Sequence, residues 1–142
     1  MQENKNALDE LNKGATMGMD FLKFIIEKVE DKDFKRVLSK QYDAYLKISK
    51  KVNKIYEDYA DKTPHETSTM EKVMVWSDIQ MKTINDKSTS KIAEMLLQGT
   101  NMGIIEGRKM LNNKVLDKKV NDLIEEFVGM QEEYVEVLKS FL

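Results

Sequence analysis

Few side chains in this sequence could carry out acid–base or nucleophilic chemistry. The 142 residues include one histidine, His65, and no cysteine, which excludes disulfides, thiolate metal sites and a cysteine nucleophile. His65 follows Pro64 and has no recognisable partners for a catalytic triad. The carboxylate pairs Glu125–Glu126 and Glu132–Glu133 are adjacent in sequence, so each pair lies largely on different faces of a helix. A solvated surface is therefore favoured over an acid–base pair, and we expect no catalytic residues.

The most informative spacing is a repeated glycine motif. Leu11–Gly18 recurs 85 positions later as Leu96–Gly103. Neither copy is a phosphate-binding loop, because no Lys-Ser/Thr follows and no strand precedes it. A glycine inside a helix costs about 1 kcal/mol relative to alanine, so four of them need a reason. We expect close packing between the first and third helices at Gly14, Gly18, Gly99 and Gly103. The alternative is that the missing side chains leave a pocket.

A candidate central pocket would be built around two glutamines. Gln41 and Gln131 interrupt otherwise apolar seams, where a buried amide must find hydrogen bonds. They either form a structural polar layer at similar depths, with Tyr45 and Tyr134 as partners, or contact a ligand. Glu106 is the only acidic residue that we place near the interior of the first or third helix. The candidate residues are Met17, Gln41, Tyr45, Met102, Glu106, Gln131 and Tyr134. The ten methionines are otherwise expected to fill the core.

The elements that would position these residues are helices. Hydrophobic residues make up 41% and charged residues 34% of the chain, with one proline and six glycines, which favours helix over sheet. The length suits one domain with a proper core. The net charge of −2 comes from 23 basic and 25 acidic residues that are well mixed, unlike the basic stripe of a nucleic-acid binder. With no apolar run of membrane-span length and a polar N-terminus, we expect a soluble cytoplasmic protein with no nucleic acid partner and no membrane insertion.

Apolar positions three and four apart mark three helical seams. They are Leu8, Leu11, Ala15, Gly18, Leu22, Ile25 and Val29; Phe34, Leu38, Gln41, Tyr45, Ile48, Val52, Ile55 and Tyr59; and Val120, Ile124, Phe127, Gln131, Tyr134, Leu138 and Phe141. Asp31 or Asp33 can cap the second helix, and Asp117 stands to the fourth helix as Asp31 stands to the second. The remaining helix should start near Ser88 or Ser90 and run to Asn112–Asn113.

The connection between the second and third helices is too long for a turn. Residues 62–87 should form a crossover between one hairpin, 1–61, and another, 88–142, within a single domain of residues 1–142. Their apolar positions indicate a short extra helix: Met70, Val73, Met74, Trp76 and Ile79. It could cover the side of the bundle. Alternatively, Val73, Trp76 and Ile79 could contact a second copy in a homodimer or another protein partner. A lengthwise crossover would make the first and third helices antiparallel and relate the hairpins by an approximate two-fold axis.

This duplicated all-α arrangement resembles the ferritin-like four-helix bundle over nearly the whole chain. The run Phe21–Pro64 also looks like the helical pairs of ferritin-like proteins of unknown function from Gram-positive bacteria. The resemblance implies the fold, but a ferritin-like di-iron site needs Glu-x-x-His on two helices and glutamates on the others, and Glu-x-x-His is absent here. We therefore expect no metal and no cofactor.

The function expected from these features is that of a non-catalytic structural or interaction protein. By resemblance to spore-associated ferritin-like proteins, its setting would be stress or sporulation in a bacterium. The alternative is a ligand-binding protein or a metal-dependent oxidoreductase with an atypical site around Glu106, Gln41 and Gln131.

Overall fold

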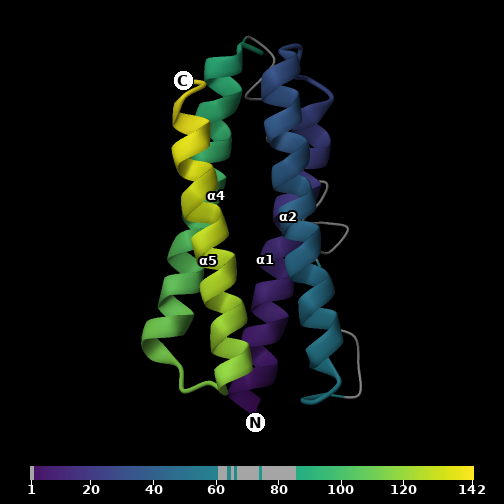
Figure 1. Cartoon of the computed structure of the whole chain (residues 1–142), viewed down its shortest axis with the longest axis vertical. Coiled ribbons are helices and arrows are strands. Elements are labelled where there is room, and N and C mark those ends of the chain that lie inside the picture. The colour runs from purple at the N-terminus through teal and green to yellow at the C-terminus, as the bar shows by residue number, and fades with distance from the viewer. Residues whose placement is uncertain (1, 61–63, 65, 67–73, 75–85) are drawn as a thin grey trace.

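The computed structural model describes residues 2–60, 64, 66, 74 and 86–142. These contain four helices: α1 (Gln2–Ile26), α2 (Lys32–Tyr56), α4 (Thr89–Asn113) and α5 (Lys118–Lys139). The closest packing is within two antiparallel hairpins, α1 with α2 and α4 with α5, which stand side by side along a common long axis (Figure 1). The expected all-α four-helix bundle of two helical hairpins is confirmed.

The two hairpins are joined by a long connection. Figure 1 shows α1 and α5 running in one direction and α2 and α4 in the other, so α2 ends and α4 begins at opposite ends of the bundle. The first and third helices are therefore antiparallel, as expected. The extra helix and the partner surface at Val73, Trp76 and Ile79 lie outside the described residues, as does His65, and they stay predictions.

Side-chain caps explain where two of the helices begin, and a third helix has an aspartate at the same position. Asp31 caps α2 by accepting a hydrogen bond from the Phe34 backbone N–H at 2.8 Å, as expected. Ser88 caps α4 in the same way, which confirms the expected start of that helix. Asp117 holds the N-cap position of α5 but makes no side-chain cap bond. Its carboxylate instead accepts the Tyr59 hydroxyl at 2.8 Å, so this aspartate ties α5 to the region after α2.

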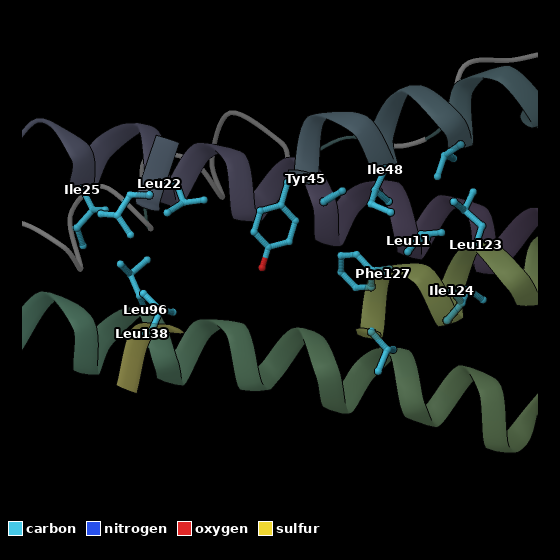
Figure 2. Close-up of a cluster of buried hydrophobic side chains, with 14 of the residues drawn as sticks. Leu11, Leu22, Ile25, Tyr45, Ile48, Leu96, Leu123, Ile124, Phe127 and Leu138 are labelled. Atoms are coloured by element: carbon cyan, nitrogen blue, oxygen red, sulfur yellow. The ribbon is translucent and has the colours of Figure 1, made fainter. Parts of the chain in front are cut away.

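One hydrophobic core runs along the bundle and includes Tyr45. Leu22, Ile25 and Leu96 lie on one side of Tyr45, and Leu11, Ile124 and Phe127 lie on the other (Figure 2). Burial of these seams stabilises the bundle by removing apolar surface from water. None of the helices in the described part of the chain is long and apolar enough to cross a membrane. At the level of Tyr45, the buried polar side chains of Gln41 and Gln131 join this core.

Candidate ligand-binding pocket at the bundle centre

A pocket of about 480 Å³ lies at mid-height of the bundle. Its exposed lining residues, which include Met17, Met102 and Glu106, come from α1 and α4, whereas α2 and α5 contribute buried residues. The pocket therefore opens between α1 and α4. Its volume falls within the range of about 300–1,000 Å³ typical of small-molecule sites.

Six of the seven residues named for a central pocket line this one. They are Met17, Gln41, Tyr45, Met102, Glu106 and Gln131. Tyr134 is half-buried and does not line the pocket. Burial raises its pKa, and the nearby charges of Glu133 and Asp43 raise it further.

Three of the four glycines of the repeated motif lie beside side chains from α2 and α5. A Cβ on Gly18 would lie 2.8 Å from the ring of Tyr45, and a Cβ on Gly103 would overlap the side-chain amide of Gln131. A Cβ on Gly14 would lie 3.4 Å from the Phe127 ring. The expected close packing of α1 against α4 at these glycines is therefore not what the nearest atoms show. The glycines make room for an aromatic ring and an amide that reach between the helices.

Gly99 differs from the other three glycines. A Cβ built on it would meet no described atom within 4 Å, so the space beside it is open. Gly99 also lines the pocket. Of the two explanations for the glycine motifs, packing and a pocket, the pocket describes the surroundings of Gly99.

The internal repeat shows where this open space comes from. Motif positions in α1 and α4 differ by 85, whereas the N-caps Asp31 and Asp117 set a difference of 86 for α2 and α5. Tyr45 therefore corresponds to Gln131, and Gln41 corresponds to Phe127. The contact of Gly18 with Tyr45 mirrors that of Gly103 with Gln131.

One pair of equivalent positions breaks the symmetry. Phe127 fills the space beside Gly14, and its counterpart Gln41 leaves the space beside Gly99 open. The open space beside Gly99 therefore lies where the two halves of the repeat differ.

Hydrogen bonds join the polar side chains at this level. The Tyr45 hydroxyl donates to Oε1 of Gln131 at 3.0 Å, and Nε2 of Gln41 donates to the Thr100 hydroxyl at 3.2 Å. Nε2 of Gln131 donates to the backbone carbonyl of Phe127 at 3.3 Å. Gln41 and Gln131 are each 1% exposed, which confirms that they reach similar depths. Tyr45 is a partner as expected, and Thr100 takes the place expected for Tyr134.

Thr100 was missed in the sequence, although the repeat carries a signal for it. Thr100 stands where the first half has Ala15, 85 positions earlier. Both positions are buried. A hydroxyl in place of a methyl at a buried position needs a hydrogen-bond partner, and Gln41 replaces Phe127 at the neighbouring position. The two polar departures from the repeat therefore meet each other.

The interior of the pocket is uncharged. Burial raises the pKa of Tyr45 to about 12, and hydrogen bonds from Gln41 and Thr100 offset only part of that rise, so the phenol keeps its proton at neutral pH. Oε1 of Gln41 is buried and has no hydrogen-bond partner among the described residues. The charged lining residues Glu10, Lys13 and Glu106 are exposed.

Glu106 is not an interior carboxylate, contrary to expectation. Its side chain is 67% exposed and lies 4.0 Å from Lys109, which is also exposed. At this level of the bundle the interior is occupied by Tyr45 and Gln131 from α2 and α5, and Glu106 reaches water at the pocket mouth.

These residues do not fit the di-iron centre of ferritin-like proteins. Such a centre needs inward carboxylates and imidazoles, whereas the buried groups here are two amides, a threonine hydroxyl and a protonated phenol. Within residues 2–60 and 86–142, no three histidine, aspartate or glutamate side chains come together as a metal site.

No protein-family model, curated protein or solved structure matches the chain. The function is therefore inferred from the residues around the pocket. They offer an apolar cavity, one unpaired carbonyl oxygen and a charged mouth. Amides and a threonine hydroxyl do not titrate and Tyr45 holds its proton, so this site suits binding rather than proton transfer.

Proposed function

We propose that this chain is a non-catalytic binding protein for a small, mainly apolar molecule held in the pocket between α1 and α4. The open space beside Gly99 carries the proposal. Gly18 and Gly103 disfavour helix, but their missing side chains make space for Tyr45 and Gln131. No described side chain occupies the space beside Gly99. Gly99 is exposed, so this space is open to solvent, and a ligand that covers the apolar walls beside it would add stability to the folded protein.

The chemistry of the walls supports an apolar ligand. Leucine, methionine and phenylalanine side chains line the pocket, including Leu22, Leu96, Met110 and Phe127. Transfer of apolar surface from water to such walls contributes roughly 25 cal/mol per Å². Sites between the helices of a bundle are a common place for small ligands.

A pair of leucine variants tests the proposal. Gly99→Leu puts a side chain into the open space, and Gly129→Leu makes the same change on α5 at an exposed glycine that does not line the pocket. The uncharged fluorophore N-phenyl-1-naphthylamine serves as the probe. We expect wild type and Gly129→Leu to bind it equally and Gly99→Leu to bind it at least about tenfold more weakly. Equal binding by all three proteins, or no binding by wild type, would contradict the proposed function.

The structural or interaction protein expected from the sequence is a second candidate. We infer a ferritin-like arrangement from the antiparallel α1 and α4 and the long connection between hairpins. Met102 and Ile105 on α4 are 67% and 52% exposed, which gives this face apolar surface that a protein partner could cover. A role in stress or sporulation and a homodimer through Val73, Trp76 and Ile79 remain part of this candidate. Sedimentation analysis tests the dimer: a wild-type dimer that Trp76→Ala dissociates supports it, and a wild-type monomer contradicts it.

A further inference from the structure

Donor and acceptor can be assigned for each hydrogen bond at the pocket, and the assignment begins with Gln131. Nε2 of Gln131 donates to the backbone carbonyl of Phe127 at 3.3 Å. A carbonyl can only accept, so this contact fixes which end of the amide is nitrogen. Oε1 of Gln131 therefore faces Tyr45, and the Tyr45 hydroxyl must use its one proton to donate to it, at 3.0 Å.

The same assignment extends from Tyr45 to Gln41. With its proton committed, the Tyr45 oxygen can only accept further hydrogen bonds, and those from Gln41 and Thr100 hold its pKa below the value that burial alone would give. Nε2 of Gln41 lies 3.2 Å from the Thr100 hydroxyl. Thr100 gives its one proton to the Tyr45 oxygen, so its own oxygen accepts from Nε2 of Gln41, and the nitrogen end of that amide faces the hydroxyl groups. Its oxygen is left as the free end of the network.

That free end is a buried acceptor on a residue that lines the pocket. Oε1 of Gln41 is buried without a hydrogen-bond partner among the described residues, and Gln41 lines the pocket. A buried carbonyl oxygen without a donor is unfavourable, so a ligand that supplies one gains affinity by removing that penalty. A ligand that offers only an acceptor there would place two oxygen lone pairs against each other.

We propose that the ligand is an uncharged molecule with an apolar body and one hydroxyl or N–H group, and that this group donates to Oε1 of Gln41. This inference rests on the proposed binding function and names its ligand class. The apolar walls disfavour a charge inside the pocket, because an ion would lose its hydration without a buried partner of opposite sign. Any charged extension of the ligand would have to lie at the mouth, where Glu10, Lys13 and Glu106 are exposed.

Three naphthalenes of similar shape separate the contributions of size and hydrogen bonding. 2-Naphthol carries a donor, 2-methoxynaphthalene carries only an acceptor, and 2-methylnaphthalene carries neither. Their dissociation constants are measured by displacement of the fluorescent probe. We expect wild type to bind 2-naphthol about threefold to tenfold more tightly than 2-methylnaphthalene, with 2-methoxynaphthalene the weakest of the three.

Two matched variants assign this preference to one residue. Gln41→Leu removes the acceptor, and Gln98→Leu makes the same change at an exposed residue of α4 outside the pocket lining. We expect Gln41→Leu to bind 2-naphthol and 2-methylnaphthalene equally and Gln98→Leu to keep the wild-type preference. In wild type, 2-naphthol should also shift the NMR signals of the Gln41 side-chain amide more than 2-methylnaphthalene does.

The outcomes distinguish this inference from the proposed function. If wild type binds all three compounds with equal affinity, or prefers 2-methoxynaphthalene, the donor inference is wrong while the pocket remains a binding site. This would be the result if water already occupied the acceptor. If wild type binds none of them and does not bind the fluorescent probe, the proposed function itself fails. Because the compound series is decisive on wild type alone, a Gln41→Leu protein that does not fold would leave the test intact.

Discussion

The internal repeat suggests a substitution that should close the pocket with a contact that the protein already makes. Phe127, from the second half of the repeat, packs beside Gly14 of the first half, next to Ala15. Gln41 and Thr100 occupy the equivalent positions beside Gly99. The double variant Gln41→Phe with Thr100→Ala therefore copies the Phe127 and Ala15 arrangement into the pocket. We expect a folded protein that is more stable than wild type.

The size of the effect follows from three contributions. Burying a phenylalanine side chain contributes about 1.5–3 kcal/mol. Removing Oε1 of Gln41, which has no described partner, relieves roughly 1–3 kcal/mol, and losing the bond between Gln41 and Thr100 costs about 0.5–1.5 kcal/mol. Together these raise the free energy of unfolding by about 1–5.5 kcal/mol, with the lower end expected if neighbouring side chains must move to admit the ring.

Urea denaturation followed by far-ultraviolet circular dichroism measures this change. Gln131→Leu is the matched comparison, because both ends of the Gln131 amide are bonded. Its removal leaves the buried Tyr45 hydroxyl without an acceptor, so that variant should lose about 1–3 kcal/mol. The reasoning is refuted if the double variant folds normally but is less stable than wild type by more than about 1 kcal/mol. It is also refuted if the double variant still binds the fluorescent probe with wild-type affinity.

Two further predictions concern Gly18 and Tyr45. Gly18→Ala should be less stable than Gly99→Ala by about 1–3 kcal/mol in thermal or urea unfolding, because both gain helix propensity but only the first places a Cβ 2.8 Å from the Tyr45 ring; equal stabilities would contradict the glycine assignment. Tyr45 should contribute about 2–3 kcal/mol of stability that is fully present below pH 10 and lost as pH rises to 12, since its pKa is about 12 when folded and 10 when unfolded. Urea unfolding across this range should show a shallower loss for Tyr45→Phe, and an unchanged slope would refute the assignment.

Much of the fold could be predicted from the sequence because helix signals are local. Apolar residues three and four apart define each seam, and capping residues such as Asp31 and Ser88 mark where α2 and α4 begin. The length of the connection predicted that its two ends lie far apart, which the directions of α2 and α4 bear out. Asp117 holds the N-cap position of α5, as its correspondence with Asp31 predicted, but its carboxylate accepts from Tyr59 and makes no cap bond.

The site was harder to predict because it depends on how the two hairpins face each other. Small residues at a spacing of four are equally compatible with helices that touch and with side chains that intrude from neighbouring helices. The sequence alone does not say which side chain faces Gly18 or Gly103. The role of Glu106 failed for the same reason: its position on α4 was read correctly as central in height, but its face of the helix points to water. The residue number sets the height of Glu106 along α4, whereas what its face of the helix meets depends on how the hairpins pack.

The repeat contains more information about the site than the individual motifs do. α1 corresponds to α4 with a difference of 85 in residue number, and α2 corresponds to α5 with a difference of 86. With these offsets, the Tyr45–Gln131 hydrogen bond joins two equivalent positions. The departures that matter are Gln41 for phenylalanine and Thr100 for alanine, two neighbouring polar replacements that satisfy each other only in part. A purely structural polar pair would gain nothing from an unpaired oxygen beside an open glycine. A pair that binds a ligand would gain from such an oxygen, because the ligand could donate a hydrogen bond to it. The asymmetry of the repeat, rather than either glutamine alone, therefore favours a ligand.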